Sequence, residues 1–302
     1  MSDRLRNLYE SFTRRLAAEP EISIDGMRDL FEQWHLATAE PDGVTYREVT
    51  DAPVPATWCT PLGSDTRRAI VYTHGGGFVV GSRHSHRKLA GHLATRCATP
   101  VLVIDYRRAP EHPYPAQVDD TVSVAEWLTR AHGFVPAQIA FAGDSAGGNI
   151  AVSSALRLSR TGLAPAAVVA MSPWFDLANS GPSLEENARH DAMVNRPTLE
   201  AMTGLVLNGQ SPETPGANPL GADLTLLPPT FVTASQHETL RDDATRFAAR
   251  AEAAGRDITL LIEPHAQHVF QMAAGRSPAA DRALDQIGQW VQERFLSGAR
   301  RN

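Results

Sequence analysis

The segment 143–147, Gly-Asp-Ser-Ala-Gly, has a serine at its centre and overlaps the end of an apolar run, Ile139–Gly143. A helix-like segment, Ser145–Arg160, begins at the same serine. A serine on a sharp turn from a strand into a helix has its hydroxyl exposed above the sheet, and the helix N-terminus adds a positive dipole and free N–H groups. This context predicts that Ser145 is a nucleophile. The plainer alternative is a glycine-rich turn that Ser145 caps.

A run of glycines, His-Gly-Gly-Gly-Phe at 74–78, follows the apolar stretch Ala69–Thr73. Attack on an ester carbonyl produces a tetrahedral oxyanion, which requires hydrogen-bond donors that are already in place. Glycines let backbone N–H groups point inward and let a substrate approach closely. The same glycines could bind a phosphate, but their spacing matches neither GxxxxGK[ST] nor GxGxxG, and no lysine or acidic ribose ligand follows at the right place.

A nucleophilic serine needs a base, and the base needs an acid that orients it. Two histidines, His265 and His268, follow the last apolar run within residues 263–270, EPHAQHVF. Their spacing also suits a metal site, but no third cluster of ligands stands nearby, so we expect no metal. At this level both histidines are candidates for the base.

Three carboxylates compete for the role of the acid within residues 235–243, SQHETLRDD. Asp242 and Asp243 fall in the first turn of the next predicted helix, where the helix dipole stabilises a carboxylate without any catalytic role. This accounts for both aspartates and leaves Glu238 as the acid. The resulting chain order of serine, acid and histidine is typical of nucleophiles on a strand-to-helix turn.

The candidate residues follow predicted strands. Eight short runs predict strands, of which the first two alternate or are half polar, as antiparallel strands near an edge are. The later six are almost continuously apolar, as parallel strands buried on both faces are. The expected strands are Thr45–Thr50, Val54–Cys59, Ala69–Thr73, Val101–Tyr106, Ile139–Gly143, Ala167–Met171, Thr230–Ala234 and Ile258–Ile262.

Helix-like segments separate the later strands, which favours an α/β fold with a mostly parallel sheet and helices on both faces. The expected helices are His86–Cys97, Ala116–Ala131, Ser145–Arg160, Asp242–Ala254 and Ala279–Phe295.

Two regions break this alternation. Residues 1–42 predict two helices, Arg4–Ala18 and Ile24–Thr38, with Ser23 as a cap of the second. Residues 174–228 are a long, proline-rich insertion where a single crossover helix is expected, and such insertions are usually functional.

We expect the N-terminal helices, 1–42, and the insertion, 174–228, to form one lid over the carboxyl ends of the strands, where open α/β sheets bind ligands. The alternative is two unrelated surface elaborations. The catalytic core then comprises residues 43–173 and 229–302.

The composition is that of an ordinary globular protein, with 42% apolar and 21% charged residues among 302, which excludes wholesale disorder. A net charge of −6 without a long basic run gives no reason to expect a nucleic acid partner. Two cysteines, Cys59 and Cys97, are too few for a disulfide scaffold. The charged N-terminus and the lack of 18 consecutive apolar residues argue against a signal peptide and a membrane span, so we expect a cytoplasmic protein.

Together, the motifs resemble the hormone-sensitive-lipase-like branch of the α/β-hydrolase superfamily, the bacterial carboxylesterases with a cap and an HGGG loop. The resemblance covers nearly the whole chain and rests on HGGGF (74–78), DYRRAPEHPYPA (105–116), GDSAGG (143–148), SPWFDL (172–177), HETLRDD (237–243) and HVF (268–270). It implies the α/β-hydrolase fold, with an eight-stranded, mostly parallel sheet and a helical cap, and no cofactor. The chain departs from the family in having Glu238 where Asp is commoner and His265 where Gly is frequent.

Residue by residue, the resemblance implies a triad of Ser145 as nucleophile, His268 as base and Glu238 as acid. The acid and the base stand 30 residues apart, about the usual separation in the family. The resemblance also implies which N–H groups bind the oxyanion, and we expect three further residues to contact the substrate. The donors are the N–H groups of Gly76, Gly77 and Ala146, and the contacts come from Asp144, Phe78 and Trp174.

One further segment has a bracing role in this interpretation. Arg107, Glu111 and His112, in the stretch DYRRAPEHPYP, are expected to form a buried ion pair and a turn that support the glycine loop.

The expected activity is hydrolysis of carboxylic esters of short to medium acyl chain, about two to eight carbons, or of lactones, through an acyl-enzyme. The resemblance extends to monoterpene ε-lactone hydrolases. The alternatives are an amidase or acyltransferase with the same machinery, and a small-molecule receptor on an inactive scaffold. We expect no membrane partner and leave a homodimer open. The predicted apolar lid residues are Leu8, Phe12, Leu30, Phe31, Trp34, Trp174, Phe175, Met193, Met202, Leu205 and Leu207.

Overall fold

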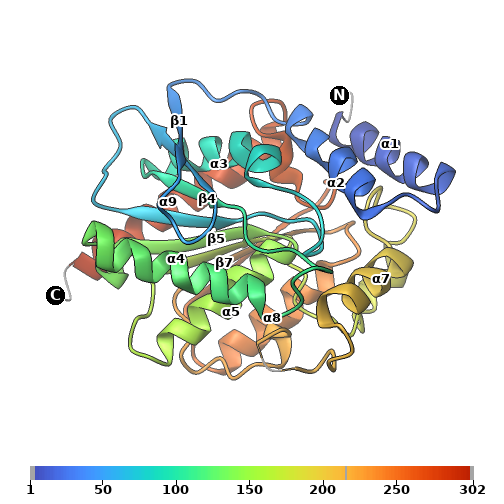
Figure 1. Ribbon diagram of the computed structural model, residues 1–302. Coiled ribbons are helices and arrows are strands. Elements are labelled where there is room, and N and C mark those ends of the chain that lie inside the picture. The colour runs from blue at the N-terminus through green and yellow to red at the C-terminus, as the bar shows by residue number, and fades with distance from the viewer. Residues whose placement is uncertain (1–3, 215, 300–302) are drawn as a thin grey trace.

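One eight-stranded sheet forms the centre of the protein (Figure 1), in the order β1-β2-β4-β3-β5-β6-β7-β8. The computed structural model describes residues 4–214 and 216–299; residues 1–3, 215 and 300–302 of the predicted domains lie outside them. β2 is antiparallel to both β1 and β4, and all other neighbours are parallel, as predicted. The strands are β1 (Val44–Val49), β2 (Ala56–Pro61), β3 (Ala69–Thr73), β4 (Val101–Ile104), β5 (Ile139–Asp144), β6 (Ala167–Met171), β7 (Thr230–Ser235) and β8 (Ile258–Glu263).

Helices cover both faces of the sheet (Figure 1). α3 and α9 contact each other on one face, and α4 and α5 contact each other on the opposite face, with α8 beside β7 and β8. The central strands are fully buried because both faces are covered, which is why their sequences are almost continuously apolar. These helices are α3 (Arg83–Cys97), α4 (Ala116–His132), α5 (Ala146–Ser159), α8 (Arg241–Ala253) and α9 (Pro278–Ala299).

Local signals set several helix boundaries. α3 begins three residues before its predicted start, because the Ser82 side chain accepts hydrogen bonds from the backbone of His84 and Ser85 in a capping box. Ser23 caps the N-terminus of α2, as predicted, by accepting a hydrogen bond from the backbone of Gly26. The predicted helix Ile24–Thr38 is shorter in the structure, where α2 ends at Glu32 and a 3₁₀ turn, η1 (Gln33–Leu36), follows.

The N-terminal helices and part of the insertion lie at the same end of the sheet (Figure 1). α1 and α2 lie beside the carboxyl ends of the strands, and α7, from the insertion, lies below them in the same view. The remaining elements of these regions are short. The elements of these two regions are α1 (Arg4–Ala18), α2 (Ile24–Glu32), η1, α6 (Ser183–Glu186), α7 (Arg196–Leu207) and the 3₁₀ turn η3 (Pro219–Gly221). Two further 3₁₀ turns, η2 (Pro136–Gln138) and η4 (Phe270–Ala273), belong to the catalytic core.

The predicted buried ion pair in the segment after β4 is wrong. Arg107 pairs with Asp120 of α4 at 2.8 Å and is about half exposed. Glu111 is also half exposed and pairs with Arg28 of α2 at 2.6 Å, which lowers the pKa of its carboxyl to about 2. The correct partners lie on other elements, so spacing within the segment could not identify them. The pairing of Arg28 with Glu111 fastens α2 to the segment that supports the glycine loop.

In the described ranges, no helix combines the length and the apolar character that crossing a membrane requires.

Candidate active site

Ser145 lies on a strained turn between β5 and α5. Its backbone angles, φ 52° and ψ −122°, are rare for a residue with a side chain, so neighbouring contacts must hold them. The Ser145 N–H donates to the carbonyl of Met171 at 2.8 Å, and the Ser145 carbonyl accepts from the N–H of Trp174 at 3.1 Å. A side chain at Gly147 would have its Cβ 2.0 Å from the carbonyl oxygen of Thr73, so only glycine lets α5 start this close to β3. The predicted strand–turn–helix context of Ser145 is confirmed.

The structure separates the two candidate bases. His268 is buried and lines the same cavity as Ser145. Its Nδ1 lies 3.8 Å from Oε2 of Glu238, which is fully buried behind it. Contacts of this length often tighten to hydrogen bonds when an enzyme binds substrate. His265 is exposed and its ring stacks on His237, with 5.7 Å between centroids, so it does not compete with His268 for this place.

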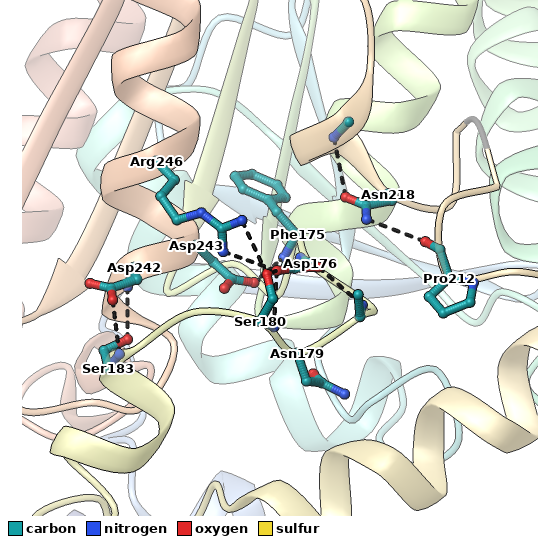
Figure 2. Close-up of polar contacts among 12 residues, drawn as sticks. Phe175, Asp176, Asn179, Ser180, Ser183, Pro212, Asn218, Asp242, Asp243 and Arg246 are labelled. Carbon is teal, nitrogen blue, oxygen red and sulfur yellow. Dashed lines mark hydrogen bonds and ion pairs between the residues drawn. The ribbon is translucent and has the colours of Figure 1, made fainter.

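The two competing acids make other contacts (Figure 2). Asp243 Oδ2 accepts hydrogen bonds from the N–H groups of Phe175 and Asp176, each at 2.8 Å. Asp242 makes two hydrogen bonds with Ser183. Its carboxylate accepts from the N–H of Ser183 at 2.8 Å, and the N–H of Asp242 donates to the Oγ of Ser183 at 3.0 Å. These two aspartates attach the beginning of the insertion to the start of α8, and Glu238 is the carboxylate that faces His268.

Burial and pairing set the protonation of the Glu238–His268 pair. Burial raises the pKa of the Glu238 carboxyl above its ordinary value, although His268 and Ser172 both favour its charged form. Burial disfavours the charged imidazole of His268, but the adjacent Glu238 outweighs this and raises the pKa of His268. An imidazole whose positive charge is supported in this way is suited to accept a proton during a reaction.

Asp144 binds the first residue of the glycine loop that follows β3. Oδ1 of Asp144 accepts hydrogen bonds from the N–H of Gly75 at 3.0 Å and from the Tyr72 hydroxyl at 2.6 Å. Oδ2 lies 3.3 Å from Nε2 of His86. Asp144 is completely buried; burial opposes its charge, but His86 and Tyr72 outweigh this and lower its pKa. Asp144 also lines the cavity that holds Ser145, and its predicted contact with substrate stays a prediction.

The predicted oxyanion donors lie near Ser145. Gly76 and Gly77 have φ values of +115° and +59° and line the cavity together with Ser145. These backbone angles favour glycine. Ala146 is the first residue of α5, where N–H groups have no carbonyl partner within the helix. The three N–H groups therefore belong to two segments beside Ser145, and their role as oxyanion donors stays a prediction.

The cavity above Ser145 has a volume of about 250 Å³ and is mostly apolar. Trp174 lines it, as predicted, but Phe78 does not; its ring packs against Trp174 with 5.7 Å between centroids. Side chains from both α1 and α7 line it. The predicted lid residues that line it are Phe31, Trp34, Trp174, Met193 and Met202, whereas Leu8, Phe12, Leu30, Phe175, Leu205 and Leu207 do not.

Three residues that the sequence did not single out contact the site. The Tyr9 hydroxyl donates to the carbonyl of His268 at 3.0 Å. The Ser172 hydroxyl donates to Oε2 of Glu238 at 2.7 Å. His86 lies beside Asp144. The only available signal was for Ser172, which stands in the SPWFDL motif. In the part of the chain that the structure describes, no three or more His, Cys, Asp or Glu side chains gather in a way that could hold a metal ion.

A strained serine turn after β5 and a glycine loop after β3, on a sheet with this strand order, define the α/β-hydrolase class. A family model described as the α/β hydrolase fold matches residues 70–272, and the chain belongs to this family.

Known proteins similar to this chain agree with this assignment. An acetyl-hydrolase from Streptomyces hygroscopicus is 34% identical over 91% of this chain and 97% of its own length. Esterase LipU from Mycobacterium tuberculosis is 38% identical over 76% of this chain and 78% of its own. A crystal structure of an esterase from the bacterial hormone-sensitive lipase family is 38% identical and superimposes with a TM-score of 0.91, covering 98% of this chain and 99% of that one. The predicted resemblance to the hormone-sensitive-lipase-like esterases is confirmed.

Proposed function

We propose that this protein is a serine hydrolase that cleaves carboxylic esters of short to medium acyl chain, and lactones, through an acyl-enzyme on Ser145. Ester hydrolysis is the activity named for its relatives. The observation that carries the mechanism is that Ser145 and His268 line one cavity while Glu238 lies buried behind His268.

In this mechanism Nδ1 of His268 faces Glu238, which leaves Nε2 free to act on the serine. His268 takes the proton of Ser145 as the hydroxyl attacks the ester carbonyl, and Glu238 stabilises the imidazolium that forms. The N–H groups of Gly76, Gly77 and Ala146 stabilise the oxyanion. The imidazolium then protonates the leaving alcohol, and a water molecule repeats the sequence to release the acid.

The lining of the cavity favours small, uncharged substrates. Phe31, Trp34, Met193 and Met202 give it apolar walls, and apolar pockets with few polar groups select hydrophobic ligands. The N-terminal helices and the insertion supply these walls together, and we propose that they act as one lid. Acyl groups of about two to eight carbons, and cyclic lactones, match such a pocket.

Two other functions use the same scaffold. Amide hydrolysis or acyl transfer needs the same triad and differs only in the leaving group or the acceptor. A receptor on an inactive scaffold would not need His268 and Glu238 to be paired behind the serine, so their arrangement favours an enzyme. The cytoplasmic location and a homodimeric state stay predictions from the sequence.

A fluorophosphonate probe and an ester panel test this proposal. The probe should label the protein at Ser145, and p-nitrophenyl esters of two to eight acyl carbons should be cleaved faster than longer ones. A protein that the probe does not label would favour the receptor. A rate that rises steadily with chain length and jumps above the micellar limit would indicate a lipase acting on aggregated substrate.

A further inference from the structure

The backbone is strained at the residue that follows His268. Val269, the next residue, has φ 48° and ψ 51°, in the left-handed region. A β-branched residue rarely adopts this conformation, which costs on the order of 1–3 kcal/mol and persists only where the surroundings hold it. The turn at Val269 directly follows the backbone that carries the side chain of His268. The contacts that hold this turn therefore bear directly on the proposed base.

Side chains from two distant segments bind both polar groups of the peptide unit between His268 and Val269. The carbonyl of His268 accepts a hydrogen bond from the Tyr9 hydroxyl of α1 at 3.0 Å. The N–H of Val269 donates to Oγ of Ser172, just after β6, at 3.0 Å. All four residues are buried, so water does not compete for these groups.

Ser172 connects the turn to the acid as well. Its Oγ accepts from Val269 and donates its proton to Oε2 of Glu238 at 2.7 Å. One hydroxyl thereby fixes the backbone beside the base and one oxygen of the acid. Direct contact between the acid and the base is looser, with 3.8 Å between Oε2 of Glu238 and Nδ1 of His268. The relative position of acid and base therefore depends on Ser172 and on the peptide unit that it holds.

We infer that Tyr9 and Ser172 are positioning residues for the proposed base, His268: Tyr9 fixes the carbonyl, and Ser172 the N–H, of the peptide unit behind it. The inference rests on the proposed triad. It gives the N-terminal helix α1 a role in the reaction itself, in addition to its place in the cavity wall. The hydroxyl of Tyr9, 259 residues away in sequence, reaches the backbone of the base.

A purely architectural role for Tyr9 predicts different kinetics. Tyr9 is buried in the core and lines the cavity, so losing its ring would loosen α1 and enlarge the pocket. That would lower the melting temperature and raise KM. Removing only the hydroxyl leaves the ring in place but frees the carbonyl of His268. A misplaced base lowers kcat and leaves KM nearly unchanged.

The test compares Tyr9→Phe and Ser172→Ala with wild type on p-nitrophenyl butyrate and by the rate of fluorophosphonate labelling. We expect kcat and the labelling rate to fall by about 10- to 100-fold in each variant, as small displacements of a catalytic group do. KM should change by less than about threefold, because the ground-state contacts of the substrate are retained.

Two matched controls remove hydroxyls that do not touch the triad. Ser11→Ala acts on α1, where the exposed hydroxyl donates to the carbonyl of Leu8 at 2.6 Å. Ser154→Ala acts in α5, where the buried hydroxyl has no hydrogen-bond partner among the residues that the structure describes. Both should keep the wild-type kcat.

The outcomes separate this inference from the proposed function. Wild-type protein that the probe does not label would overturn both. Labelled wild type with a Tyr9→Phe variant whose kcat stays within about twofold, or whose KM alone rises, would overturn the positioning role and leave the triad intact. If Ser172→Ala does not fold, Tyr9→Phe decides the matter by itself.

Discussion

The carboxylate of Asp144 accepts a hydrogen bond from the backbone N–H of Gly75 at 3.0 Å, so the residue before the proposed nucleophile holds the first glycine of the proposed oxyanion loop. Two segments almost seventy residues apart are thereby fixed relative to each other. A side chain at Gly75 would have its Cβ 2.2 Å from Oδ2 of Asp144, which leaves no room for any residue but glycine.

Replacing Asp144 by Asn should weaken this connection. An amide oxygen can still accept from Gly75 and Tyr72, which share one oxygen of Asp144, but it is a weaker, uncharged acceptor, and the amide nitrogen takes the place of the oxygen that faces His86. We expect kcat to fall by about 10- to 100-fold, less than the loss of an oxyanion donor itself can cost. Steady-state kinetics on p-nitrophenyl butyrate measure it, with Asp257→Asn, a half-exposed carboxylate, as the control. An unchanged kcat would show that the loop holds its shape without Asp144.

Replacing Ser145 by Ala should remove the nucleophile and lower turnover by about a million-fold, as in other triad enzymes. The fold should survive, since the Ser145 contacts that hold the turn come from its backbone. Turnover and the melting temperature together check this. Activity within about tenfold of wild type would reject the acyl-enzyme mechanism.

Turnover should be sensitive to replacement of Glu238 and tolerant of replacement of Asp243. Glu238→Gln removes the counter-charge of the imidazolium and should lower kcat by about ten-thousand-fold, as the loss of a triad acid does. Asp243→Asn should affect kcat far less. An amide oxygen can still accept the hydrogen bonds from the N–H groups of Phe175 and Asp176, and burial already raises the pKa of Asp243 to about 8, which disfavours its charged form. Comparing kcat for the two variants decides between them, and the reverse order would move the acid to Asp243.

Replacing His268 should reduce the activity far more than replacing His265. His268→Ala should abolish ester hydrolysis, because His268 is the histidine that both lines the cavity and faces Glu238. His265→Ala removes an exposed ring that stacks on His237 and should only weaken activity. Initial rates for both variants provide the measurement. An active His268→Ala enzyme would disprove the assignment of the base.

The pH dependence follows from the raised pKa of His268. The base must be neutral to accept the serine proton, so kcat/KM should fall as the pH drops through this pKa. Because the folded value lies above the ordinary one, the midpoint of the acid limb should lie above about pH 6.5. Glu238→Gln removes the charge that raises it, so the limb should move to lower pH in any residual activity. A midpoint below that of free histidine would contradict the pairing.

The sequence by itself determined the fold class and the chemistry. The strands could be predicted because parallel strands buried on both faces require continuous apolar runs, and β3 and β6 match their predicted ranges residue for residue. The nucleophile turn and the glycine loop could be predicted because each needs small residues at consecutive positions. Such constraints are local, so they leave a readable pattern.

Only the tertiary structure decided which side chains support that chemistry. It placed His268 in the cavity and His265 on the surface, gave Arg107 the partner Asp120, and brought Tyr9 to the carbonyl of His268. Each of these contacts joins residues from different elements. Their distances depend on how α1, α4 and the loop after β8 pack against the sheet, and no local spacing in the chain records that packing.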